Sequence, residues 1–167
     1  EGIAVCDGGV ALSLYGCGAM ADILRYESAS AVRALSDRGG VVGIYFMPFL
    51  REEGQPMAAD VIAHIEHAWN VCGEDHVGIG TDGGIPAIEF DEEYRRRHRE
   101  DVRQRRARGI SAPGETEDVY TFIPDLNDAR RLDLLADALS ARGHSDDRIE
   151  KLLGANFERL FGEVWGG

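Results

Sequence analysis

The stretch DHVGIGTDGG, from Asp75 to Gly84, places a carboxylate at the end of a predicted buried strand. Val77 and Ile79 supply its apolar side chains, and the glycines around them let other backbone or a ligand approach closely. The last residue of a parallel strand projects from the C-terminal edge of the sheet, where β/α barrels gather their catalytic residues. Asp82 is therefore a candidate site residue, although the spacing fits a turn or N-cap role about equally well.

Strands and helices alternate before this stretch. The run VVGIYFMPF, which starts at Val41, is continuously apolar and predicts a strand buried on both faces. The apolar residues of 57–72 recur at intervals of three and four, which predicts an amphipathic helix. A strand over Val10–Leu14 and a helix over Glu27–Asp37 are expected upstream. Short connections between these elements predict an α/β fold with about three parallel strands and flanking helices.

A charge-dense segment follows. Residues 91–108 read DEEYRRRHREDVRQRRAR, which predicts a helix with few apolar residues inside an insertion at about 88–118. Acidic residues alternate with the arginines, and i,i+4 pairs such as Glu92 and Arg96 are typical of a solvated helix. We interpret the insertion as an excursion on the surface.

Two more helices are expected near the end of the chain. Residues 127–142 carry leucines at helical spacing, and Gly143 is expected to stop that helix. Ser145 is a candidate N-cap for the next helix, over Asp146–Leu153.

Composition limits the function. The 167 residues fit one domain or part of a larger one, and 18 basic against 30 acidic residues argue against nucleic acid as a partner. No apolar run approaches the roughly 20 residues that a membrane helix needs, so no transmembrane segment is expected. Cys6, Cys17 and Cys72 form no C-x-x-C pair, which favours a reducing compartment and predicts a cytoplasmic location. Residue 1 is Glu rather than Met, so we expect the start of a longer protein to be missing.

Two histidines on one predicted helix invite a metal interpretation. His64 and His67 are separated by three, but neither H-E-x-x-H nor H-x-x-E-H is present and no third ligand lies at a supporting spacing. We therefore do not assign a metal to them. Cys72, at the apolar end of the same helix, is interpreted as a small core residue.

Three segments resemble, in order, the C-terminal part of the renal or membrane dipeptidase family. They read RGGVVGIYFMPF, DVIAHIEHAWNVCGEDHVGIGTD and DLLADALSARGHSDDRIEKLLGANFERLFGEV. The family consists of zinc-dependent dipeptidases with a β/α barrel related to the amidohydrolases. The resemblance implies that residues 1–167 are a partial metallo-dependent hydrolase domain, the C-terminal part of a (β/α)8 TIM-like barrel. Val41–Phe46 and His76–Asp82 would then be its seventh and eighth strands.

The resemblance also implies a function and a site. The parent protein would be a zinc-dependent dipeptidase, a hydrolase that cleaves the peptide bond of dipeptides with two zinc ions. Asp82 is similar to the family's last-strand aspartate, which faces the metal pair, contacts the substrate and handles the proton between attacking water and leaving amine. Arg25 falls where the family keeps an arginine that grips the substrate carboxylate.

The sequence also departs from the family. Leu14 falls where the family has a zinc-ligand histidine, and leucine cannot coordinate zinc. Gly83-Gly84 replaces a longer D-F-D-G-like continuation, and the remaining family ligands would lie upstream of Glu1. No metal-ligand set is therefore expected intact; of the candidates, only Asp82 would lie near the metal pair, and the isolated chain should bind zinc poorly and be inactive. The alternative is a non-catalytic fragment or pseudoenzyme that acts through protein association, and homo-oligomer formation is left open.

Overall fold

The computed structural model describes residues 3–6, 9–13, 27–51, 53–81, 83–84, 86–111 and 115–166.

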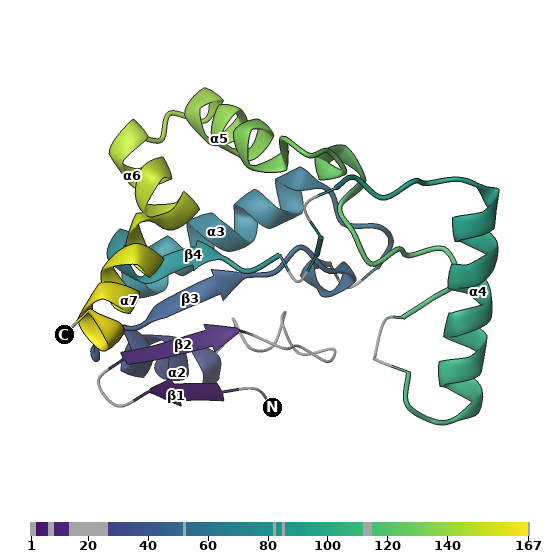
Figure 1. Ribbon diagram of the computed structural model, residues 1–167, viewed down its shortest axis with the longest axis horizontal. Helices are drawn as coiled ribbons and strands as arrows, with labels where there is room; N and C mark the ends of the chain where they lie inside the picture. The colour runs from purple at the N-terminus through teal and green to yellow at the C-terminus, as the bar shows by residue number, and fades with distance from the viewer. Residues whose placement is uncertain are drawn as a thin grey trace.

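A four-stranded sheet with the order β1-β2-β3-β4 forms the centre of the fold (Figure 1). Its strands are β1 (Ile3–Cys6), β2 (Gly9–Ser13), β3 (Val41–Ile44) and β4 (Val77–Ile79). β2 pairs with β3 and β3 with β4 in parallel, whereas β1 pairs with β2 antiparallel. The α/β class is thus confirmed. The short strand β1 was not predicted, because its four residues carry too little pattern.

Two helices connect the parallel strands. α2 (Glu27–Ser36) lies between β2 and β3, and α3 (Ala58–Cys72) lies between β3 and β4. α3 matches the periodicity closely, since its apolar positions are its buried ones: Val61, Ile62, Ile65, Ala68, Trp69 and Cys72. These side chains pack with β3 and β4 residues in the main hydrophobic cluster. Burial of this face is what holds α3 against the sheet.

The strand β4 is shorter than expected. It ends at Ile79, whereas the prediction extended it to Asp82.

Gly78 lies under the ring of Phe157, and a Cβ built on Gly78 would come within 2.3 Å of that ring. Glycine is required here because the aromatic side chain occupies the space that any larger residue would need.

The C-terminal helices follow a different division from the predicted one. α5 (Arg131–Ala141) starts four residues late because a 3-10 turn (Pro124–Leu126) precedes it. α6 (Asp146–Glu150) continues through a π-helical turn (Lys151–Ala155) into α7 (Asn156–Trp165), with non-helical backbone angles at Gly154. The side chain of Ser145 accepts a hydrogen bond from the backbone of Arg148, which confirms it as the N-cap of α6.

The charged helix α4 (Glu92–Ala107) stands apart from the sheet, on the side toward which the arrows of β2 and β3 point (Figure 1). Asp91 caps it by accepting a hydrogen bond from Tyr94 N at 2.7 Å. Glu92 pairs with Arg95 rather than with Arg96 as expected. The helix is not uniformly solvated, because His98 and Val102 are buried.

Aromatic rings join the two ends of the α4 excursion. The ring of Phe90, before the helix, lies 4.7 Å from that of Tyr120 and 5.3 Å from that of Phe122, both after it. Tyr94 also contacts Tyr120 and Phe122 edge-on or tilted. We refer to Phe90, Tyr94, Tyr120 and Phe122 as the aromatic cluster. It anchors α4 to the main body.

Candidate functional site

The C-terminal ends of β3 and β4 lie side by side. Ile44 is in register with Ile79, and Gly80 N donates to Ile44 O at 3.0 Å just beyond the strands. A Cβ on Gly43 would lie 3.4 Å from Gly80 N, so the two backbones approach closely here. The glycines of the quoted stretch thus serve contact between neighbouring strands and, at Gly78, contact with α7.

Asp82, the principal candidate residue, lies outside the described residues, as do Arg25 and Leu14. The neighbours of Asp82 in the chain are described. Gly83 N donates to Thr81 Oγ1 at 3.3 Å, a short-range turn that brackets the position of Asp82 in the sequence. The candidate site is therefore built from the loop that follows β4.

Two side chains near the start of α5 hold this loop. Arg131 donates to Gly84 O at 2.9 Å and to Pro86 O at 3.2 Å. Asn127 donates to Ile88 O at 2.8 Å and accepts from Ile88 N at 2.7 Å, as a neighbouring strand would. Gly84, Pro86 and Ile88, which belong to the described part of the loop, are thus fixed by contacts that the sequence does not reveal.

Two hollows flank the loop. A small one, of about 40 Å³, lies between the loop and Phe46, Phe122 and Leu126. A larger one, of about 240 Å³, lies between the loop and Ile79, Leu132 and Leu153. Thr81, Gly83, Gly84 and Arg131 line both. This edge of the sheet therefore offers room next to the loop on two sides.

Gln55 joins the segment after the insertion to the segment before α3. Its Nε2 donates to Phe122 O at 2.8 Å, and its Oε1 accepts from Tyr120 N. Asp125 Oδ1 accepts from Ala58 N, the first residue of α3, at 2.8 Å. Residues 120–126 are thereby placed along one wall of the smaller hollow.

Metal-ligating side chains do not cluster among the described residues: no group of three or more His, Cys, Asp or Glu there could hold an ion. His64 Nε2 is instead hydrogen-bonded to Leu50 O at 2.9 Å, and His67 is exposed. A zinc site needs three or four protein ligands, so the described residues do not by themselves fit a zinc centre.

Cys72 is a core residue, as predicted. Its side chain is buried, and its Sγ donates to Ala68 O at 3.1 Å. Burial raises the pKa of the Cys72 thiol to about 11. A thiol that stays protonated at neutral pH is a poor nucleophile, so Cys72 has no part in the candidate site.

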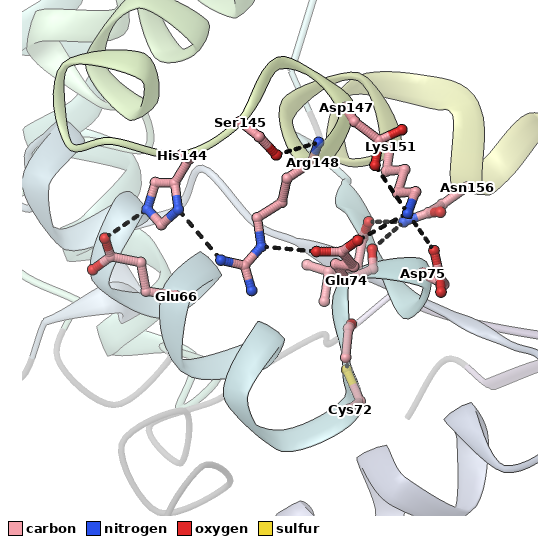
Figure 2. Close-up of polar contacts among 12 residues, drawn as sticks. Glu66, Cys72, Glu74, Asp75, His144, Ser145, Asp147, Arg148, Lys151 and Asn156 are labelled. Carbon is pink, nitrogen blue, oxygen red and sulfur yellow. Dashed lines mark hydrogen bonds and ion pairs between the residues drawn. The ribbon is translucent and has the colours of Figure 1, made fainter.

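A charged cluster links α3 to α6 (Figure 2). Glu66 receives a bidentate pair from Arg142, at 2.8 and 2.7 Å, and a hydrogen bond from His144 at 3.0 Å. Lys151 contacts Glu74, Asp75 and Asp147, and these contacts raise the pKa of its ammonium group. Glu74 and Asp75 immediately precede β4, so this part of the cluster lies at the N-terminal end of the strand, opposite the candidate site. Polar residues at that end of a β/α unit contribute to stability rather than to chemistry.

Replacement of Glu66 by Gln is expected to make the free energy of unfolding depend less on pH between about pH 4.5 and pH 2. The hydrogen bonds from Arg142 and then His144 lower the pKa of Glu66 from 4.5 to about 2. A depressed folded-state pKa gives stability that is present above about pH 4.5 and is lost as the pH falls toward 2. After a discount for the partly exposed pair, we expect Glu66→Gln to cost about 1 to 2 kcal/mol at pH 7 and little near pH 2. Urea unfolding of both proteins at several pH values measures this.

The matched control is Glu150→Gln, at an exposed position on α6. It should leave the unfolding free energy within about 0.5 kcal/mol of wild type at every pH. If the curve for Glu66→Gln ran parallel to wild type from pH 7 to pH 2, the Glu66 pairing would contribute nothing to the pH dependence of stability.

Comparison with known proteins identifies several relatives of this chain. Residues 27–93 match the sequence model of membrane dipeptidase, peptidase family M19. The chain is 31% identical, over 80% of its length, to an uncharacterized protein in the pqqA 5' region of Klebsiella pneumoniae, and it spans 39% of that protein. It is 24% identical, over 78% of its length, to dipeptidase tcpJ of Claviceps purpurea, of which it spans 23%. The chain therefore spans well under half of these relatives.

A solved structure shares the fold. The crystal structure of dipeptidase AC, a metallopeptidase of family M19, superimposes with a TM-score of 0.56 at 23% identity, over 83% of this chain and 32% of that one. The two proteins thus share an α/β fold over most of this chain. The resemblance to the membrane dipeptidase family, peptidase family M19, is confirmed. Among the helices that the structure describes, none combines the length and apolar character needed to cross a bilayer.

Proposed function

We propose that this chain is the closing part of a (β/α)8 barrel in a longer metallo-dipeptidase that hydrolyses the peptide bond of dipeptides. The observation that carries the proposal is the loop after β4, which lies at the C-terminal edge of the parallel strands between two hollows. β/α barrels place catalytic groups on such loops. The match to the membrane dipeptidase family includes this loop, since it covers residues 27–93.

Within this proposal Asp82 acts in proton transfer. A carboxylate at this place accepts a proton from the attacking water and returns it to the leaving amine as the C–N bond breaks. Arg25 binds the substrate's carboxylate through its guanidinium group. Zinc, which polarises the carbonyl and activates water in such enzymes, would need ligands from residues other than those described.

The test is dipeptide hydrolysis by the longer polypeptide that includes this chain. The purified protein should hydrolyse members of a dipeptide panel, should lose activity on dialysis against a chelator, and should regain it when zinc is added back. The isolated chain is expected to hydrolyse none of them and to bind zinc weakly in calorimetry. If the longer, metal-loaded protein hydrolysed no dipeptide, the result would support a non-catalytic role through protein association.

A further inference from the structure

One face of the charged helix α4 borders a hollow of about 310 Å³, which we call the α4 hollow. Its residues on the helix recur at intervals of three and four, and the segment after the excursion contributes one more: Tyr94, Arg97, His98, Asp101, Arg105 and Thr121. Thr121 also lines the smaller hollow beside the loop after β4. The α4 hollow therefore adjoins the C-terminal edge of the parallel strands.

Three side chains of the α4 hollow are held in place by contacts within the chain. His98 is 7% exposed, and its Nε2 donates to Thr116 O at 3.2 Å, because a carbonyl oxygen can only accept. The ring of Tyr94 packs in the aromatic cluster, and Arg105 forms an ion pair with Glu115. These walls need no ligand to order them, as in most small-molecule sites.

Two oppositely charged side chains of the α4 hollow, Arg97 and Asp101, do not pair with each other. Both are exposed, and among the residues that the structure describes neither side chain makes an ion pair or a hydrogen bond. They lie one helical turn apart, a spacing at which opposite charges on a helix ordinarily interact. Glu92 and Arg95, on the same helix, do form an ion pair. A guanidinium group and a carboxylate thus border the same space, each with its binding capacity unused.

This pair of charges is complementary to a zwitterion. A guanidinium group donates two parallel hydrogen bonds to a carboxylate, and a carboxylate accepts hydrogen bonds from an ammonium group. A free amino acid or a dipeptide carries both groups at neutral pH. A simple anion would be repelled by Asp101 and a simple cation by Arg97, whereas a zwitterion gains from both. The size also fits, since small-molecule pockets begin at about 300 Å³.

We propose that the α4 hollow binds a zwitterionic amino acid or dipeptide, with the carboxylate of the ligand on Arg97 and its ammonium group on Asp101. Tyr94 and His98 provide an aromatic wall for the side chain of the ligand. This inference goes beyond the proposed function and does not depend on it. Dipeptides and free amino acids are nevertheless the substrates and products of the proposed reaction.

The test titrates the longer, metal-loaded polypeptide with L-leucine in a calorimeter. L-Leucine carries both charges and has no peptide bond to hydrolyse, and we expect a Kd of about 1 mM or below. N-acetyl-L-leucine lacks the ammonium group and L-leucinamide lacks the carboxylate. Each of these two probes should therefore bind about 5-fold more weakly or worse.

Replacement of one charge at a time assigns each contact. Arg97→Met and Asp101→Asn should each weaken L-leucine binding by about 5-fold or more. Arg97→Met should leave the affinity for L-leucinamide unchanged, and Asp101→Asn that for N-acetyl-L-leucine, because the group that each side chain binds is already missing. The matched controls are Arg96→Met and Glu93→Gln, at exposed positions on α4 that do not line the α4 hollow, and both should bind L-leucine like wild type.

Hydrogen exchange locates the bound ligand independently of its affinity. L-Leucine should slow the exchange of peptides that contain residues 94–105 and 115–121 by about 2-fold or more in wild type. The same peptides should not respond in Arg97→Met or Asp101→Asn. Circular dichroism shows whether each variant is folded, and the three probes on wild type decide the matter if one variant is not.

Three results would overturn the proposal. Equal L-leucine affinities in wild type, Arg97→Met and Asp101→Asn would place any binding elsewhere in the protein. Equal binding of all three probes would show that the ligand's charges are not recognised. The absence of heat up to about 20 mM L-leucine would show that the α4 hollow binds no amino acid of this kind. Dipeptide hydrolysis decides the proposed function separately, because L-leucine binding requires no turnover.

Discussion

Replacement of Asp82 by Asn in the longer polypeptide is expected to lower dipeptide turnover by about 10²-fold or more. Asparagine keeps the size of the side chain but cannot accept the proton that hydrolysis must move from water to amine. Zinc content should change less than turnover, because the substitution removes a proton carrier and leaves the zinc ligands of the longer polypeptide in place. Single-turnover and steady-state kinetics with metal analysis on the same samples measure both quantities.

Asp75→Asn is the matched control for Asp82→Asn. Asp75 lies before the other end of β4, where it is exposed and pairs with Lys151, so the same chemical change should leave turnover unaltered. Equal turnover in wild type and Asp82→Asn would rule out a proton-transfer role for Asp82.

The largest effect on stability is expected at Asn156, the first residue of α7. Its Nδ2 donates to Glu74 O at 2.7 Å and to Val77 O at 2.8 Å, and the residue is 3% exposed. Asn156→Asp removes both donors and places a carboxylate against two carbonyl oxygens, so we expect a loss of about 3 kcal/mol or more at pH 7. Urea unfolding followed by circular dichroism measures the change.

The comparison variant for Asn156→Asp is Asn70→Asp, at an exposed position on α3. It should change the free energy of unfolding by less than about 0.5 kcal/mol. Asn156→Ala should fall between the two, because it leaves the carbonyls unpaired without adding a charge. Similar unfolding curves for all three variants would mean that the Asn156 contacts carry no stability.

The sequence predicts those parts of the fold that depend on local pattern. The helix over 57–72 is confirmed, because the residues at its apolar positions are the buried ones. The run at Val41 is confirmed as a buried strand, but β3 ends at Ile44 rather than at the expected Phe46. The boundaries of α5 and α6 were wrong, because a 3-10 turn at Pro124 and a π-helical turn at Gly154 depend on packing rather than on spacing.

The bracing of the candidate site could not be predicted in the same way. Arg131 and Asn127 act on Gly84, Pro86 and Ile88, which lie 39 to 47 residues away along the chain. An arginine at the start of a helix and an asparagine before it have ordinary local explanations, and nothing in one sequence links them to the loop. Gln55 was missed for the same reason, since it contacts Tyr120 and Phe122 across 65 and 67 residues.

The contact between the rings of Phe90 and Tyr120 brings the two ends of the segment 91–119 together. Phe90 and Tyr120 both lie outside α4, so their contact joins the two ends of the segment without any residue of the helix. Loop-closure cost grows only slowly with length, so a segment of another size between such fixed ends changes the closure cost little, although it loses the contacts of Tyr94 with Tyr120 and Phe122. We therefore expect insertion or loss of coding sequence at this junction to leave the sheet intact.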